Sequence, residues 1–90
     1  MDVKYKPSYD RDIDKITNKD IAKRLEELIK KLKEVDNLFN VSNCKKIKKN
    51  ENRYRIRIGN YRLGIEKKED TIFLVRFLHK KDFEKDKDFS

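Results

Sequence analysis

Hydrophobic and polar positions recur at two different periods along the chain, and the change of period separates predicted helices from predicted strands. After Thr17 the apolar residues keep helical spacing and form a single stripe: Ile21, Leu25, Leu28, Leu32 and Val35. Thr17 and Asp20 have the spacing of a capping box at the start of this segment, and Asn18 is an alternative N-cap. The pattern predicts a long amphipathic helix that packs on a core.

A shorter helix is expected before the long one. Pro7 ends a short extended segment over Val3 to Lys6, and Ser8 offers an N-cap. Over residues 9–16, three apolar residues fall on one helical face: Tyr9, Ile13 and Ile16. After the long helix, residues 36–43 are rich in turn formers and are predicted to be a loop with apolar anchors: Leu38, Phe39 and Val41.

The second half of the chain alternates with the period of a β-strand. Arg53 to Ile58 places isoleucines and a tyrosine on one face and three arginines on the other. Gly59 and Asn60 are typical of a two-residue hairpin turn, and a second alternating strand follows over Tyr61 to Lys67. After a turn at residues 69–70, residues 71–79 are apolar on both faces, as expected of a central strand.

These elements predict an α+β fold in a single domain over residues 1–90, with residues 82–90 as a flexible tail. We expect an N-terminal helical hairpin on one face of a small, mainly antiparallel sheet of four to five strands. In the last strand Arg76 should share the open polar face with the other arginines, since a charged side chain avoids the core. Strict alternation then places His79 on the helix side.

The charge of the chain is concentrated in one segment. Lys45 to Arg62 contains eight basic residues and one acidic residue, so this fifth of the chain carries +7 of the net charge of +8. A run of charge is often only a solvated face, but this concentration favours a site for a polyanion, either a nucleic acid or a membrane surface.

Other classes of function have little support in the composition. No apolar stretch is long enough to cross a bilayer and Met1 to Lys6 is unlike a signal peptide, so we expect a soluble, cytoplasmic protein. The single cysteine, Cys44, and the single histidine, His79, do not provide the ligand cluster that zinc requires. We therefore expect no metal and no cofactor.

Two segments of the chain carry a resemblance to a known family. Residues 54–63 read Tyr-Arg-Ile-Arg-Ile-Gly-Asn-Tyr-Arg-Leu, and residues 79–83 read His-Lys-Lys-Asp-Phe. Together with the two preceding helices, this order resembles the RelE/ParE superfamily of toxins from type II toxin-antitoxin systems, over nearly the whole chain. The resemblance implies a cognate antitoxin as partner, and RNA rather than a membrane as the partner of the basic segment. In RelE-like members it further implies a polar sheet face that binds mRNA in the ribosomal decoding site and cuts it.

The resemblance matches Arg55, Arg57, Arg62 and Lys80 to basic positions of the family, and these residues with the adjacent Lys81 are the expected catalytic residues. The concentration of charge and the polar strand face predict the RNA-binding residues: Lys45, Lys46, Lys48, Lys49, Arg53 and Arg76. An arginine can neutralise phosphate charge but does not give up its proton at physiological pH. Proton transfer is therefore left open among Lys80, Lys81, His79, Glu66 and Glu84, the last of which stands where the family usually has a tyrosine.

Two other functions are compatible with the same resemblance. One is a ParE-like toxin that poisons DNA gyrase by binding to it. The other is a degenerate member that keeps the fold and its affinity for RNA without catalysis.

Overall fold

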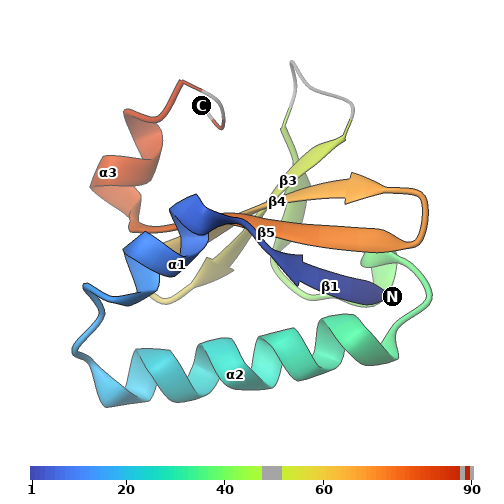
Figure 1. Ribbon diagram of the computed structural model, residues 1–90, viewed down its shortest axis with the longest axis horizontal. Helices are drawn as coiled ribbons and strands as arrows, with labels where there is room; N and C mark the ends of the chain where they lie inside the picture. Colours follow the sequence, from blue (N-terminus) through green and yellow to red (C-terminus); the bar gives the residue numbers. More distant parts are fainter. Residues whose placement is uncertain (48–51, 88, 90) are drawn as a thin grey trace.

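The computed structural model describes residues 1–47, 52–87 and 89, and its central feature is a five-stranded sheet with helices on both faces (Figure 1). The helices and strands are β1 Asp2–Tyr5, α1 Pro7–Ile13, α2 Lys19–Glu34, the 3₁₀ turn η1 Leu38–Asn40, β2 Cys44–Lys46, β3 Arg53–Ile58, β4 Tyr61–Lys68, β5 Thr71–His79 and α3 Lys80–Glu84. Helices α1 and α2 contribute to the main core on one face of the sheet. Helix α3 packs on the opposite face.

The sheet is mixed, and its strand order is β1-β5-β4-β3-β2. Strand β1 pairs in parallel with β5, while the other three pairings are antiparallel. The α+β class and the strand number are confirmed, but the predicted N-terminal helical hairpin is wrong because the first element is a strand at the sheet edge. Four residues are too few to show in sequence that Val3 pairs with the distant Ile72.

Helix α2 follows the predicted stripe closely. The Oδ1 of Asn18 accepts hydrogen bonds from the backbone N–H groups of Asp20 (2.9 Å) and Ile21 (3.1 Å), so Asn18 rather than Thr17 caps the helix. Leu25 and Leu32 are buried against the sheet. Burial of this face, more than helix propensity, holds a helix of this length in place.

Helix α1 begins earlier than the sequence suggested. Pro7 occupies its first turn, where the fixed φ of proline suits a helix and its missing N–H loses no bond. The predicted N-cap Ser8 therefore lies inside the helix, and its hydroxyl donates to the backbone carbonyl of Val75 on β5 (2.6 Å). Ser8 therefore does not cap the helix but links it to the sheet by a hydrogen bond.

Strand β5 contains a β-bulge that changes which face its residues occupy. Leu74 lies opposite Ile65 of β4, whereas Arg76 lies opposite Gly64, so Val75 is an extra residue without an opposite partner. Leu74 before the bulge and Phe77 after it therefore both face the main core. Strict alternation is therefore interrupted at Val75, and after the bulge Arg76 lies on the face of Arg55 and His79 on the side of the main core, as expected.

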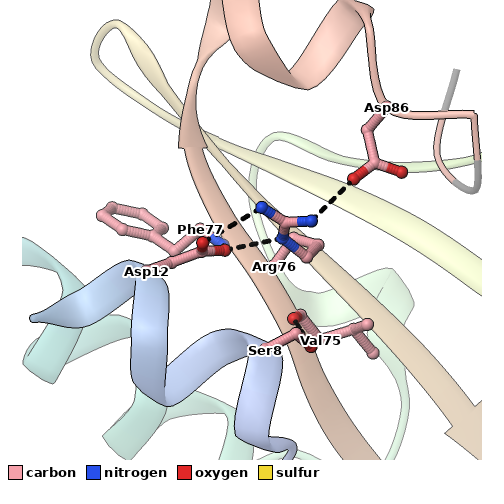
Figure 2. Close-up of polar contacts among 6 residues, drawn as sticks. All are labelled: Ser8, Asp12, Val75, Arg76, Phe77 and Asp86. Atoms are coloured by element: carbon pink, nitrogen blue, oxygen red, sulfur yellow. Dashed lines mark hydrogen bonds and ion pairs between the residues drawn. The ribbon is translucent and has the colours of Figure 1, made fainter. Parts of the chain in front are cut away.

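An ion-pair network surrounds the bulge and explains its stability (Figure 2). The buried carboxylate of Asp12 on α1 accepts hydrogen bonds from Arg76 Nε (2.8 Å), Arg76 Nη2 (3.1 Å) and the backbone N–H of Phe77 (2.9 Å). Arg76 Nη1 donates to Asp86 (3.2 Å). Arg76 lies on the sheet face of Arg55, as expected, since both lie opposite Gly64, and its guanidinium joins α1 to the chain after α3.

The C-terminal segment contributes its own small core. Phe83 and Phe89 are 3% and 2% exposed and pack with Ile47, Val75 and Leu78 on the face opposite α2. Phe89 lies so close to Gly64 that a Cβ at that glycine would come within 2.8 Å of the ring, which is why the strand needs glycine there. Two residues of the predicted tail, Phe83 and Phe89, thus contact the sheet.

Candidate functional site

A basic pocket of about 200 Å³ opens on the sheet face that carries α3. We call it the arginine pocket, and it is lined by Asn43, Lys45, Arg55, Arg57, Arg62, Lys80, Phe83 and Glu84. Five of these eight side chains are cationic and one is acidic. Strands β2, β3 and β4 supply four of the cations, and α3 supplies the remaining cation, the acid and the phenyl ring.

Strand register brings the cations together. Arg57 on β3 lies directly opposite Arg62 on β4, and Lys45 on β2 lies directly opposite Arg55. Like charges at directly opposite positions of neighbouring strands destabilise a sheet. An arrangement that places two such pairs side by side is therefore suited to an anion that would relieve the repulsion.

The Arg62 side chain is held at the hairpin turn. Its Nη1 donates to the backbone carbonyls of Gly59 (3.1 Å) and Tyr61 (3.0 Å). Gly59 adopts a φ of +57°, which only glycine tolerates easily, so the predicted two-residue turn is confirmed. Burial, followed by the charges of Arg57 and Arg55, lowers the pKa of Arg62, while Glu84 acts in the opposite direction.

The three arginines keep donor groups available for a ligand. Arg57 Nη2 donates to Asn43 Oδ1 (3.2 Å), and Asn43 itself has a left-handed φ of 63° just before β2. Within residues 1–47, 52–87 and 89, no carboxylate lies within 4.0 Å of the guanidinium of Arg55, Arg57 or Arg62. Planar guanidinium forks in this arrangement match the geometry of phosphate oxygens.

Residues 3–82 match the family model described as ParE toxin of the type II toxin-antitoxin system parDE. The chain belongs to the RelE/ParE superfamily of type II toxin-antitoxin toxins. It is 45% identical over 62 residues to Toxin RelE3 of Methanocaldococcus jannaschii, which spans 68% of this chain and 70% of that relative. A RelE/ParE fold also appears in the crystal structure of the RelB-RelE antitoxin-toxin complex from Methanococcus jannaschii. That structure matches with a TM-score of 0.81 and 35% identity, covering 91% of this chain and 95% of the matched chain.

Several predicted site residues of this RelE/ParE chain lie outside the arginine pocket. Lys46 is paired with Tyr54 on the face that carries α2, and Lys81 is exposed on α3 without lining the pocket. Arg53 forms an ion pair with Glu66 (3.4 Å) and lies under the Phe89 ring, 5.0 Å from its centroid. Lys48 and Lys49 fall outside the described residues.

The candidates for proton transfer lie in different places, and only some of them line the arginine pocket. His79 caps α3, where its Nδ1 accepts from the backbone N–H of Lys81 (3.3 Å), and its ring contacts Tyr61 on the side of the main core. Glu66 is held by Arg53 and by Lys68 (3.9 Å). Lys80 and Glu84 are the two candidates that line the pocket.

Two lining residues were not found from the sequence. Asn43 is the residue before β2, and an asparagine before a basic strand is a weak signal for a left-handed position. Phe83 follows Lys80 at helical spacing, which places both on one side of α3. Neither pattern by itself indicates a site, because only the sheet brings them beside the arginines.

Other chemistry has little support in the part of the chain that the structure describes. Burial raises the pKa of the Cys44 thiol to about 11, so a thiolate nucleophile is not available there at neutral pH. Residues 1–47, 52–87 and 89 contain no cluster of three or more His, Cys, Asp or Glu side chains suited to a metal ion. None of the described helices has the length and apolar character needed to span a bilayer.

Proposed function

We propose that this chain is a toxin that cleaves mRNA on the ribosome without a metal ion, and that a cognate antitoxin neutralises it. The observation that carries the proposal is the arginine pocket, where Arg55, Arg57 and Arg62 converge without a carboxylate within 4.0 Å among the described residues. A pocket of this size accommodates a single phosphodiester more readily than a folded partner.

The chemistry of RNA cleavage explains what such a pocket would do. Attack of a 2′-hydroxyl on the neighbouring phosphorus builds up negative charge on the non-bridging oxygens. The guanidinium groups of Arg57 and Arg62, opposite each other across two strands, are placed to neutralise that charge. Their fixed positions supply the stabilisation that a bound cation gives in other nucleases.

An antitoxin partner is supported by the kinship and by the charge. The similar solved structure is that of a RelB-RelE antitoxin-toxin complex. A basic pocket with five cations favours a partner segment that carries carboxylates. We propose that the antitoxin covers this pocket, and that the toxin acts in the cytoplasm, where mRNA and ribosomes are found.

Brief induction of the chain in growing cells tests the proposal. Primer extension should reveal new cuts within translated mRNA, and growth should stop. A second candidate, a ParE-like inhibitor of DNA gyrase, is favoured by the description of the matched family model. Gyrase-dependent DNA breaks with intact mRNA would select that candidate, and RNA binding with neither lesion would select a degenerate member.

The two adjacent lysines of β2 provide a matched test of the binding face. Lys45 lines the arginine pocket, whereas Lys46 lies on the opposite face of the same strand. Lys45→Ala should weaken binding of single-stranded RNA and reduce the slope of log affinity against log salt by about 0.7, because one phosphate contact is lost. Lys46→Ala should leave that slope unchanged. Equal losses in the two variants would show that net charge alone drives binding.

A further inference from the structure

Glu84 is the acid of the arginine pocket, and its place there needs an explanation. The other lining residues are five cations, an asparagine and a phenylalanine. A carboxylate beside a phosphate site weakens the binding of a polyanion through charge repulsion. A pocket that served only to hold RNA would bind it better without this group, which indicates a role other than binding.

The structure fixes the position of Glu84 from both sides. The preceding residue, Phe83, is buried in the small C-terminal core, and the backbone N–H of Lys80 donates to the carbonyl of Asn60 at the hairpin turn (2.7 Å). Two residues after Glu84, Asp86 accepts from Arg76 (Figure 2). The last turn of α3 is therefore held against the sheet beside the pocket.

The Glu84 carboxylate remains available to contact a substrate. Among residues 1–47, 52–87 and 89 no ion pair within 4.0 Å engages Glu84. It is nonetheless close enough to Arg62 to influence that guanidinium electrostatically. Lys80, four residues earlier, lies on the same side of α3, so one short helix presents a carboxylate and an ammonium to the same pocket.

We propose that Glu84 is the general base of this pocket, and that Lys80 is the general acid. The inference rests on the proposed cleavage of mRNA. The Glu84 carboxylate takes the proton of the attacking 2′-hydroxyl as the 2′-oxygen bonds to phosphorus. The bond from phosphorus to the 5′-oxygen breaks, and this oxygen takes a proton from the Lys80 ammonium. The products are a 2′,3′-cyclic phosphate and a 5′-hydroxyl.

The remaining lining residues are unsuited to the role of base. A guanidinium does not lose its proton at physiological pH, and a lysine ammonium has no free electron pair. The Asn43 amide is a weak base, and Phe83 has no titratable group. Among the side chains that line the pocket, the Glu84 carboxylate is the group ready to accept a proton.

Single-turnover cleavage on ribosomes programmed with a defined mRNA tests the assignment. Glu84→Gln keeps the shape of the side chain and should slow cleavage by about 10²- to 10⁴-fold. Binding of the same RNA should be unchanged or tighter, because a negative charge is removed. The matched control is Asp82→Asn, which makes the same change of charge on an exposed residue of α3 outside the pocket and should cleave at the wild-type rate.

The outcomes separate the assignment from the proposed function. If the wild-type chain does not cut mRNA, the proposed function fails and the assignment fails with it. If the wild type cuts and Glu84→Gln cuts equally fast or faster, the nuclease stands but Glu84 is not its base. If Glu84→Gln and Asp82→Asn lose activity equally, the loss reflects the stability of α3 and the assignment is overturned. Melting temperatures of the wild type and the two variants would confirm that cause.

Discussion

Arg62→Ala is expected to lower single-turnover cleavage of ribosome-bound mRNA by about 10²- to 10³-fold and to relieve growth arrest on induction. This is the loss seen when one donor to a developing oxyanion is removed. Arg62 lies opposite Arg57 across the hairpin and is anchored to the turn by its bonds to Gly59 and Tyr61. Its removal leaves the charge that builds up on the phosphate with one fewer fixed partner.

Two further variants make the Arg62 experiment specific. Arg62→Lys keeps the charge but loses the planar fork, and should recover only part of the rate. Lys81→Ala removes a cation that the sequence placed among the catalytic residues but that the structure leaves outside the pocket, and should retain most of the activity. Cleavage by Arg62→Ala at the wild-type rate would remove the arginine pocket from the mechanism.

Asp12→Asn is expected to lower the free energy of unfolding by roughly 2–4 kcal/mol. Asp12 is 3% exposed and accepts three hydrogen bonds, two from Arg76 and one from the backbone of Phe77 (Figure 2). An amide in its place offers one oxygen instead of two, and leaves the Arg76 guanidinium facing an uncharged side chain. Urea titration followed by circular dichroism measures the loss as a lower midpoint.

Asp14→Asn is the matched control for Asp12→Asn. It makes the same chemical change at an exposed residue at the end of the same helix, and should shift the free energy of unfolding by less than about 0.5 kcal/mol. Equal unfolding midpoints for the Asp12 and Asp14 variants would show that the network around the bulge contributes little to stability.

Local patterns predicted most of the secondary structure. The boundaries of β3 and β5 agree with those expected from alternation, and α2 carries the predicted stripe. These elements are long or regular enough for their own hydrophobic period to reveal them. β1 shows only a short extended segment, so its parallel pairing with β5 could not be predicted.

The partners of Arg76 on β5 could not be predicted from the sequence. Strict alternation put Arg76 on the open face with Arg55 and Arg57. The register keeps Arg76 on that face despite the bulge at Val75, but the carboxylates of Asp12 and Asp86 bind its guanidinium, and it does not line the arginine pocket. A bulge depends on partners for its exposed backbone groups, and here they are supplied by Ser8 and Asp12, more than sixty residues away in sequence.

The sequence by itself determined the α+β class, the hairpin at Gly59 and the basic strand face, because turn chemistry and alternation are local properties. Only the tertiary structure decided which cations share a pocket, since register sets Arg57 against Arg62 and Lys45 against Arg55. It also decided that the C-terminal segment packs on the sheet. Burial of Phe83 and Phe89 there brings Glu84 beside the arginines, and such burial depends on contacts between segments far apart in the chain.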